Sequence, residues 1–190
     1  MIGLRRMQNV RSLLEDVLNR NVPGDAAECG VWKGGTAIFM ASILEAYQSE
    51  KKVWVCDSFQ GMPMPIDRRD PDWSDKRDLA ISLSEVKAHF HKHGVLQRAL
   101  FVKGWFEETL PGPIGQLSLL RVDCDLYSST IAVLEALYPK LSPGGYVIID
   151  DYNGPATPVC KEAVDDYRRD HGIVTPLEIV DWCAVYWRKE

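Results

Sequence analysis

The chain opens with a hydrophobic pattern typical of a helix and continues with short apolar runs typical of strands. In residues 4–20 apolar side chains recur every three or four positions, which predicts a helix with one buried face. Later apolar runs have the length of strands and end at polar or glycine residues. The predicted strands cover residues 26–31, 52–56, 99–103, 117–122, 146–149, 177–180 and 184–187. Further helices are predicted over residues 36–48, 84–93, 128–141 and 156–170.

Helices and strands therefore alternate through most of the chain. This order predicts an α/β fold with a mainly parallel sheet covered by helices on both faces. Only residues 181–183 separate the last two strands, so we expect them to form an antiparallel hairpin at one edge. Turns are predicted at residues 21–25 and 142–145 from their Pro-Gly pairs. Ser82 or Ser84 is expected to cap the helix over residues 84–93. With no repeat or linker in the sequence, residues 1–190 are predicted to form one domain.

One segment breaks the alternation. Residues 61–78 carry prolines and the dense charge run DRRDPDWSDKRD, without hydrophobic periodicity. Such a segment is predicted to be a loop, which we place at residues 61–80. Long loops in compact domains are often functional, so a lid over a site and a solvated surface insertion are both open.

Composition narrows the class of protein. The net charge of −5 argues mildly against a nucleic-acid partner, because such proteins usually carry a basic face. Five cysteines without CxxC spacing disfavour a zinc site and are typical of a reduced cytoplasmic protein. No apolar run approaches a membrane span and the N-terminus lacks a signal-peptide core, so we expect no membrane association. The histidines at positions 89, 91, 93 and 171 fall in or beside predicted helices and are interpreted as surface residues.

Candidate chemistry gathers where the strands end, since open α/β sheets bind ligands beyond the carboxyl ends of their strands. The first strand runs into the glycine-rich segment ECGVWKGGT, and the second ends at Asp57. Glycines let a ligand approach the backbone, and an acidic residue after the second strand can accept both hydroxyls of a ribose. The pair predicts a nucleoside-containing cofactor. Because the chain has GVWKGG and not GxGxxG, NAD is the weaker fit.

The second group of candidates is acidic. Asp123 and Asp125 follow one apolar strand, and Asp150 and Asp151 follow the next. If these strands are neighbours, several carboxylates crowd one crevice, and a divalent cation such as Mg²⁺ removes the repulsion. A helix cap or a turn is the alternative for any single aspartate. A metal lowers the pKa of an acceptor hydroxyl, and a carboxylate can then remove its proton.

The motifs that carry these residues resemble the macrocin O-methyltransferase family, which methylates sugar hydroxyls of macrolide and related natural products. Matching segments cover nearly the whole chain and include VPGDAAECGVWKGGTAIFM, VWVCDSFQGMP, KGWFEETLP, LRVDCDLYSST and VIIDDY. The resemblance implies a Rossmann-like class I fold with a seven-stranded sheet, S-adenosylmethionine (SAM) as cofactor, and a possible homodimer. It also implies a small-molecule acceptor, a glycosylated or phenolic natural product.

The resemblance assigns a role to each candidate residue. Asp123, Asp150 and Asp151 are the implied Mg²⁺ ligands, with Asp123 also the implied base. Catechol-type methyltransferases share this metal arrangement more distantly, and some carry Lys where this chain has Leu126, which favours the aspartate base. The implied cofactor-binding residues are Glu28, Gly30 and Thr36 at the methionine end of SAM, Gly34 and Gly35 in the loop, Asp57 and Ser58 at the ribose, and Gly104 and Trp105 beside the adenine.

Two other functions are alternatives to a methyltransferase. A nicotinamide oxidoreductase would need a pyrophosphate loop and usually a Tyr/Lys pair, and the sequence presents neither. A shortened, non-catalytic SAM-binding protein, acting as a partner or regulator, is the stronger alternative. Family members usually have a longer segment before the position of Met1, which helps to cover the acceptor pocket and to form dimer contacts. Retention of all three metal aspartates favours the enzyme, because binding SAM alone does not require them. The sequence leaves the acceptor and the identity of the metal open.

Overall fold

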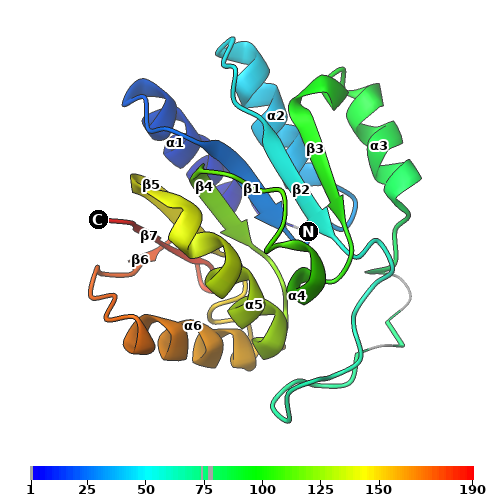
Figure 1. The fold of residues 1–190 in the computed structure, drawn as a ribbon, viewed down its shortest axis with the longest axis vertical. Helices are drawn as coiled ribbons and strands as arrows, with labels where there is room; N and C mark the ends of the chain where they lie inside the picture. The colour runs from blue at the N-terminus through cyan, green and yellow to red at the C-terminus, as the bar shows by residue number, and fades with distance from the viewer. Residues whose placement is uncertain (1, 74, 77–78) are drawn as a thin grey trace.

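The computed structural model describes residues 2–73, 75–76 and 79–190 and alternates strands with helices (Figure 1). The first half contains α1 (Leu4–Asn19), β1 (Asp25–Cys29), α2 (Gly35–Ala46), β2 (Val53–Asp57), α3 (Leu83–Lys92), a 3₁₀ turn (Leu96–Arg98) and β3 (Ala99–Lys103). The second half contains α4 (Phe106–Thr109), β4 (Leu117–Val122), α5 (Tyr127–Leu137), a 3₁₀ turn (Tyr138–Lys140), β5 (Leu141–Ile149), α6 (Pro158–Asp170), β6 (Glu178–Ile179) and β7 (Val185–Arg188).

The strands form one seven-stranded sheet in the order β3-β2-β1-β4-β5-β7-β6. β1 to β5 pair in parallel, whereas β7 is antiparallel to both β5 and β6. The predicted mainly parallel sheet and its C-terminal hairpin are therefore confirmed. β2 and β3 lie on one side of β1, whereas β4 and the later strands lie on its other side, so the strand order reverses between β1 and β4. Ligands of open α/β sheets bind at the carboxyl ends of the strands at such a point.

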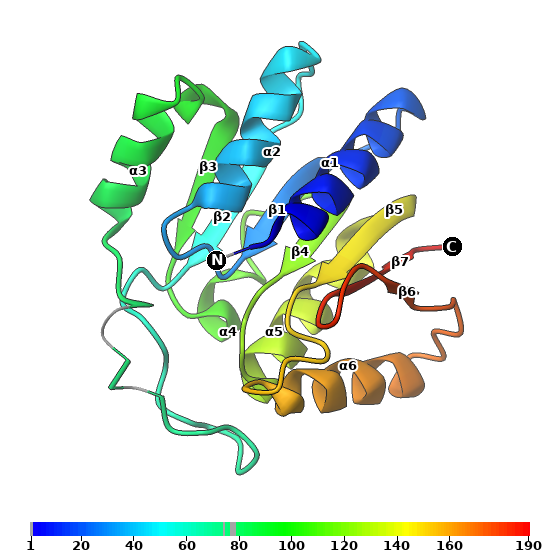
Figure 2. The ribbon, with the colours of Figure 1, turned by 180° about the vertical axis from the view of Figure 1, so that it is seen from behind.

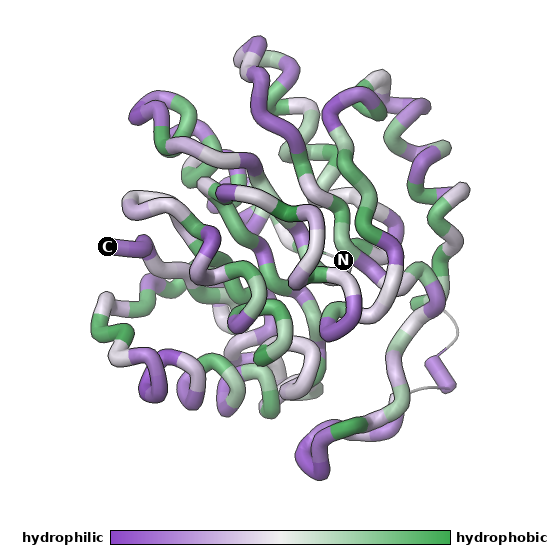
Figure 3. Tube along the Cα trace, in the orientation of Figure 1, coloured by the Kyte–Doolittle hydropathy of each residue, from purple (hydrophilic) through white to green (hydrophobic). Residues whose placement is uncertain are grey.

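Helices cover both faces of the sheet, as Figures 1 and 2 show from opposite sides. One hydrophobic cluster joins α1, α2 and α3 to one face, with Leu14 and Phe90 fully buried. A second cluster packs α5 and α6 on the other face, around Leu120 and Trp187. Hydrophobic residues follow the central strands in Figure 3, and hydrophilic ones mark the outer turns of α6. The near-continuous burial of β4 is typical of a parallel strand covered on both sides.

Local sequence explains several boundaries. Ser82 caps α3 in a capping box with Glu85, which confirms the first of the two predicted caps. The helix predicted over residues 128–141 is wrong at its end: α5 stops at Leu137, and Pro139 lies in the 3₁₀ turn that follows. A proline cannot donate the backbone hydrogen bond that a continuing helix requires.

The turn predicted at residues 142–145 is incorporated into β5 in the structure. The pairing of β5 with β4 jumps from Leu141 to Tyr146, so the Pro-Gly-Gly sequence forms an irregularity inside a longer strand. Gly144 has a φ of 83°, a value that a glycine adopts without strain. The Pro-Gly-Gly sequence therefore interrupts the regular pairing, but it does not end the strand, which continues on both sides of it.

The described residues of the segment 61–78 form no helix or strand, as predicted, and its residues 74, 77 and 78 lie outside the described part. The segment extends from the body of the molecule in both views (Figures 1 and 2). Asp70 anchors it: its carboxylate accepts hydrogen bonds from the backbone N–H groups of Tyr127 (2.6 Å) and Ser128 (3.2 Å). The side chain of Asp70 therefore caps α5, whose own N-cap residue, Leu126, offers no side-chain acceptor.

Candidate active site

A pocket of about 710 Å³ opens at the carboxyl ends of β1, β2, β4 and β5. Residues from these strand ends line it together with Ile2 and Arg6 near the start of α1 and Met62, Pro63 and Leu79 from the long loop. Of the residues predicted for the cofactor and the metal, all except Gly34 line this one pocket. The strand-end aspartates and the glycine-rich segment, distant in sequence, thus share one cavity.

Gly34 lies behind the pocket wall. It precedes α2 with a φ of 80°, and a Cβ atom there would lie 3.0 Å from Cγ1 of Val86 and 3.3 Å from Cε2 of Phe90. Its predicted role in shaping the loop fits this geometry, because the turn into α2 requires a left-handed residue packed against α3. Direct contact with a ligand is not its function in this arrangement.

Gly30 sits where β1 meets β4. With a φ of 82°, a Cβ atom on it would lie 1.8 Å from the carbonyl oxygen of Asp123, so no other residue fits without moving the chain. The backbone N–H of Asp123 in turn donates to the carbonyl of Cys29 at 2.9 Å. This close approach brings Asp123, the residue directly after β4, against the glycine-rich segment.

Asp57 is surrounded by backbone donors. Its Oδ2 accepts hydrogen bonds from Val31 N (2.8 Å) and Trp32 N (3.3 Å), and its Oδ1 accepts from Phe59 N (2.7 Å). These bonds fix both the carboxylate and the loop after β1. Ser58, the next residue, is buried; its hydroxyl donates to the carbonyl of Gly61 and accepts from Gln60 N, both at 3.0 Å.

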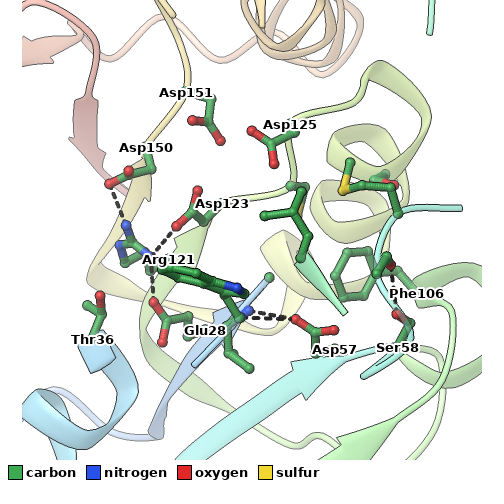
Figure 4. A pocket seen from close by; sticks show the side chains of 18 of the residues that line it. Glu28, Thr36, Asp57, Ser58, Phe106, Arg121, Asp123, Asp125, Asp150 and Asp151 are labelled. Atoms are coloured by element: carbon green, nitrogen blue, oxygen red, sulfur yellow. Dashed lines mark hydrogen bonds and ion pairs between the residues drawn. The ribbon is translucent and has the colours of Figure 1, made fainter. Parts of the chain in front are cut away.

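The remaining predicted cofactor residues border the same half of the pocket. Thr36 is buried in the first turn of α2, and Gly104 and Trp105 follow β3. Figure 4 shows Asp57 and Ser58 at one end of the pocket and the strand-end aspartates of β4 and β5 at the other, with Glu28 between them. The pocket therefore has two chemically distinct halves, here called the cofactor half and the acidic half.

The acidic half consists of Asp123, Asp150 and Asp151, which each offer an oxygen atom within 4.8 Å of the others. Burial and the charges of Asp123 and Asp125 raise the pKa of Asp151 to about 10. Burial also raises the pKa of Asp150, and burial followed by the charge of Asp123 raises that of Asp125 to about 6. Without a cation, the cluster therefore binds protons that isolated carboxyl groups release.

A buried arginine that the sequence analysis did not select lies between the two halves. Arg121, in β4, has a side chain only 2% exposed. Its Nη1 donates to Glu28 and, at 2.8 Å, to Oδ2 of Asp123, while Nη2 forms an ion pair with Oδ1 of Asp150 at 2.6 Å (Figure 4). The available signal was an arginine inside the otherwise apolar run LSLLRV, since a buried guanidinium must find carboxylates.

Arg6 is the second site residue missed from sequence. Its Nη1 lies 2.5 Å from Oδ2 of Asp150, and its Nε lies 2.8 Å from Oδ2 of Asp181 in the turn before β7. The guanidinium also lies over the ring of Trp182, 5.6 Å from its centroid. Nothing in the amphipathic pattern of α1 distinguishes Arg6 from a solvated residue.

The donor set fits a hard divalent cation. Six buried side-chain atoms lack a hydrogen bond within the described residues, and four of them line this pocket: Glu28 Oε2, Arg121 Nε, Asp150 Oδ1 and Asp151 Oδ2. Asp150 Oδ1 is nevertheless ion-paired with Arg121, so Asp151 Oδ2 is the oxygen of the three-aspartate cluster that has neither kind of partner among the described residues. Buried polar atoms are normally satisfied, so an orphaned oxygen at this point indicates a missing partner, and oxygen is the ligand atom that Mg²⁺ prefers.

Other candidate groups lie elsewhere. All five cysteines are buried free thiols. The four histidines are exposed or half-buried, and none is among the pocket-lining residues of the described chain. No helix in the described ranges is both long and apolar enough to cross a membrane.

Comparisons with known proteins give a consistent result. The chain matches the profile of the family described as macrocin O-methyltransferase (TylF) over residues 1–189. A relative from Streptomyces olivaceus, 8-demethyl-8-(2,3-dimethoxy-alpha-L-rhamnosyl)-tetracenomycin-C 4'-O-methyltransferase, is 45% identical over 197 residues, which cover 99% of this chain and 74% of that protein. Mycinamicin III 3''-O-methyltransferase from Micromonospora griseorubida is 42% identical over 200 residues, covering 100% of this chain and 78% of that protein.

The solved structures agree with the sequence comparison. The O-methyltransferase NovP superposes with a TM-score of 0.94 at 44% identity, covering 99% of this chain and 81% of that one. The observed strand order and the antiparallel last strand are those of the class I SAM-dependent methyltransferase fold that was predicted.

Proposed function

The chain belongs to the macrocin O-methyltransferase (TylF) family and is an O-methyltransferase, and from this premise we propose that it transfers a methyl group from SAM to a hydroxyl of a glycosylated natural product, at a site completed by a divalent cation. The observation that carries the proposal is the acidic half of the pocket. Three aspartates meet there at the end of a 710 Å³ cavity, and the buried Oδ2 of Asp151 has no hydrogen-bond partner among the described residues.

SAM is the proposed cofactor in the other half. Asp57 stands where a carboxylate can accept the ribose hydroxyls, with Ser58, Gly104 and Trp105 beside it. Gly30, Gly35, Thr36 and Glu28 would surround the methionine end. The unpartnered Oε2 of Glu28 supports this placement, because the ammonium group of an amino acid is a suitable donor for a buried carboxylate oxygen.

Asp123, Asp150 and Asp151 are the proposed ligands of Mg²⁺ or a similar cation. When bound, such a cation lowers the pKa of an acceptor hydroxyl by several units. Asp123 is the proposed base. Its side chain is 31% exposed and faces the pocket, whereas that of Asp150 is 7% exposed and held by two arginines, so Asp123 is the better placed to accept a proton from the acceptor.

The acceptor is proposed to be small, with its sugar hydroxyl reaching the acidic half. Support comes from the named relatives, one of which acts at the 4' position of a rhamnosylated tetracenomycin. The segment 61–78 is proposed as a partial lid, because Met62 and Pro63 line the pocket while Asp70 anchors the segment to α5. We place the protein in the cytoplasm, where the five buried thiols stay reduced.

The non-catalytic alternative is less well supported. A protein that only binds SAM has no use for three aspartates whose oxygens lie within 4.8 Å of one another and whose burial raises the pKa values of Asp150 and Asp151. Such a cluster destabilises the fold unless an ion or protons neutralise it.

The proposal is tested by calorimetric titration of the purified protein with S-adenosylhomocysteine (SAH) and separately with Mg²⁺, in the wild type and in Asp150→Asn. We expect SAH to bind both proteins and Mg²⁺ to bind only the wild type. Asp165→Asn is the matched control, because that aspartate is also ion-paired but lies on α6 away from the pocket, and it should bind both ligands normally. Absence of SAH binding by the wild type would overturn the cofactor assignment, and undiminished Mg²⁺ binding by Asp150→Asn would overturn the metal assignment.

A further inference from the structure

Arg121 contacts carboxylates that come from three different strands. Glu28 belongs to β1, Asp123 follows β4, and Asp150 follows β5. Glu28 lies between the two halves of the pocket, and Asp123 and Asp150 belong to the acidic half (Figure 4). The guanidinium is thus the one cation that joins the two halves directly among the described residues.

The sheet register makes this arrangement a consequence of the fold. Glu28 is the partner of Arg121 in the pairing of β1 with β4, and Ile148 is its partner in the pairing of β4 with β5. Side chains two positions apart on a strand point to the same face, so Asp123 and Asp150 emerge on the side of the sheet that Arg121 occupies. The guanidinium therefore contacts all three carboxylates on one face of the sheet.

Arg121 divides its side-chain nitrogens unequally among the three carboxylates. A single nitrogen, Nη1, serves both Glu28 and Asp123, while Nη2 lies against Asp150 and Nε has no partner. A planar guanidinium can hold several carboxylates at fixed angles, which the point charge of a lysine ammonium cannot do. Neither Glu28 nor Asp123 has exclusive use of Nη1 in this state.

On the basis of the function proposed above, we propose that Arg121 is a positioning residue that couples cofactor binding to metal binding. With a cation held by Asp123 and Asp150, these carboxylates would compete less for Arg121. Nη1 would then bind Glu28 more strongly and hold it in place for the amino group of the cofactor. Metal binding therefore increases affinity for the cofactor, and the cofactor must increase affinity for the metal by the same factor.

The test measures the ratio of the SAH dissociation constants without and with saturating Mg²⁺, by calorimetry. In the wild type we expect Mg²⁺ to tighten SAH binding by about fivefold or more, the usual lower range of allosteric coupling. In Arg121→Lys, both ligands should still bind, but the ratio should fall to about one, since the ammonium group cannot bridge three carboxylates. A purely structural role would lower the melting temperature and leave this ratio unchanged.

Two further variants keep the result unambiguous. Glu28→Gln preserves shape and removes one arm of the bridge, so it should also lose the coupling while retaining Mg²⁺ affinity measured without SAH. Arg168→Lys is the matched control: this half-buried arginine packs over Trp187, away from the pocket, and should keep the wild-type ratio.

The outcomes separate the two proposals. A wild-type ratio of one, or a wild-type ratio retained in Arg121→Lys or Glu28→Gln, would overturn the role of Arg121 and leave the proposed function intact. Failure of the wild type to bind SAH or Mg²⁺ at all would overturn the proposed function, and the coupling with it.

Discussion

The two halves of the pocket stabilise their carboxylates in opposite ways. In the cofactor half, Asp57 accepts three backbone hydrogen bonds, all from neutral donors of neighbouring loops. In the acidic half, Asp150 is held by the charged side chains Arg6 and Arg121, and Asp151 retains an orphaned oxygen. Both oxygens of Asp57 therefore have hydrogen-bond partners, whereas the acidic half keeps one carboxylate oxygen without a partner among the described residues.

Because the two halves hold their carboxylates differently, substitutions in each half should change different properties of the protein. Backbone hydrogen bonds to a carboxylate organise a loop before any ligand arrives, so changing Asp57 should alter cofactor affinity. In the proposed function a cation neutralises the crowded acidic cluster, so changing its members should alter catalysis more than folding.

The largest effect is expected in the acidic half. Asp123→Asn removes both the proposed base and one metal ligand, and a general base typically contributes about 10²–10⁴-fold in rate. We therefore expect the rate of methyl transfer to fall by that factor, measured by mass spectrometry of a glycosylated acceptor incubated with SAM. SAH affinity without metal should stay close to that of the wild type. A variant that retains full activity would remove Asp123 from the mechanism.

The next effect belongs to the cofactor half. Asp57→Ala removes a charged acceptor of three backbone N–H groups and, in the proposed site, of the ribose hydroxyls, so the SAH dissociation constant should rise by about 10–100-fold. Asp25→Ala is the matched control, because Asp25 also accepts a backbone N–H, from Lys52, but lies at the opposite end of β1. If both variants weaken SAH binding equally, the effect of Asp57 is one of folding and not of contact.

A smaller effect, on stability, is expected at the loop before α2. Gly34→Ala places a Cβ at a φ of 80° and 3.0 Å from Val86, which should lower the free energy of unfolding by about 1–2 kcal/mol. Gly35→Ala meets no atom within 4 Å and should change stability little. Urea denaturation of the two variants measures the difference, and equal midpoints would contradict the packing described for Gly34.

The smallest effect concerns the long loop. Asp70→Ala removes the side-chain cap of α5 and should lower the free energy of unfolding by about 1 kcal/mol. Asp75→Ala, at an exposed aspartate of the same segment, is the control and should leave stability unchanged. Thermal unfolding followed by circular dichroism compares them. Identical melting temperatures would mean that the loop is not anchored through Asp70.

Much of the fold could be predicted from the sequence because each signal was local. Strand-length apolar runs that stop at Asp57, Asp123 and Asp150 placed these residues at one edge of a parallel sheet, and the structure brings Asp123 and Asp150 together there. The end of α5 and the extent of β5 could not be placed in the same way. The predicted helix ran through Pro139, where the structure has a 3₁₀ turn. The Pro-Gly-Gly turn suggested that a strand begins after it, but sheet pairing on both sides of the turn extends β5 back to Leu141.

The missed site residues depend on contacts between distant segments. The apolar run around Arg121 signals a buried arginine, but its three partners become known when β1, β4 and β5 are aligned, because they come from all three strands. The ion pair of Arg6 with Asp181 requires that α1 lie beside the turn before β7. The hydrogen bond that Asp70 accepts requires that the long loop reach the start of α5. No residue pattern within one element reports such a placement.

The most direct test of the central claim, metal-dependent methyl transfer, is to remove divalent cations with a chelator and add Mg²⁺ back while following transfer from SAM to a glycosylated acceptor. We predict that activity disappears on chelation, returns as Mg²⁺ is added to the wild type, and does not return in Asp150→Asn. Undiminished activity in the chelated wild type would contradict the account, because the three aspartates would then serve no metal.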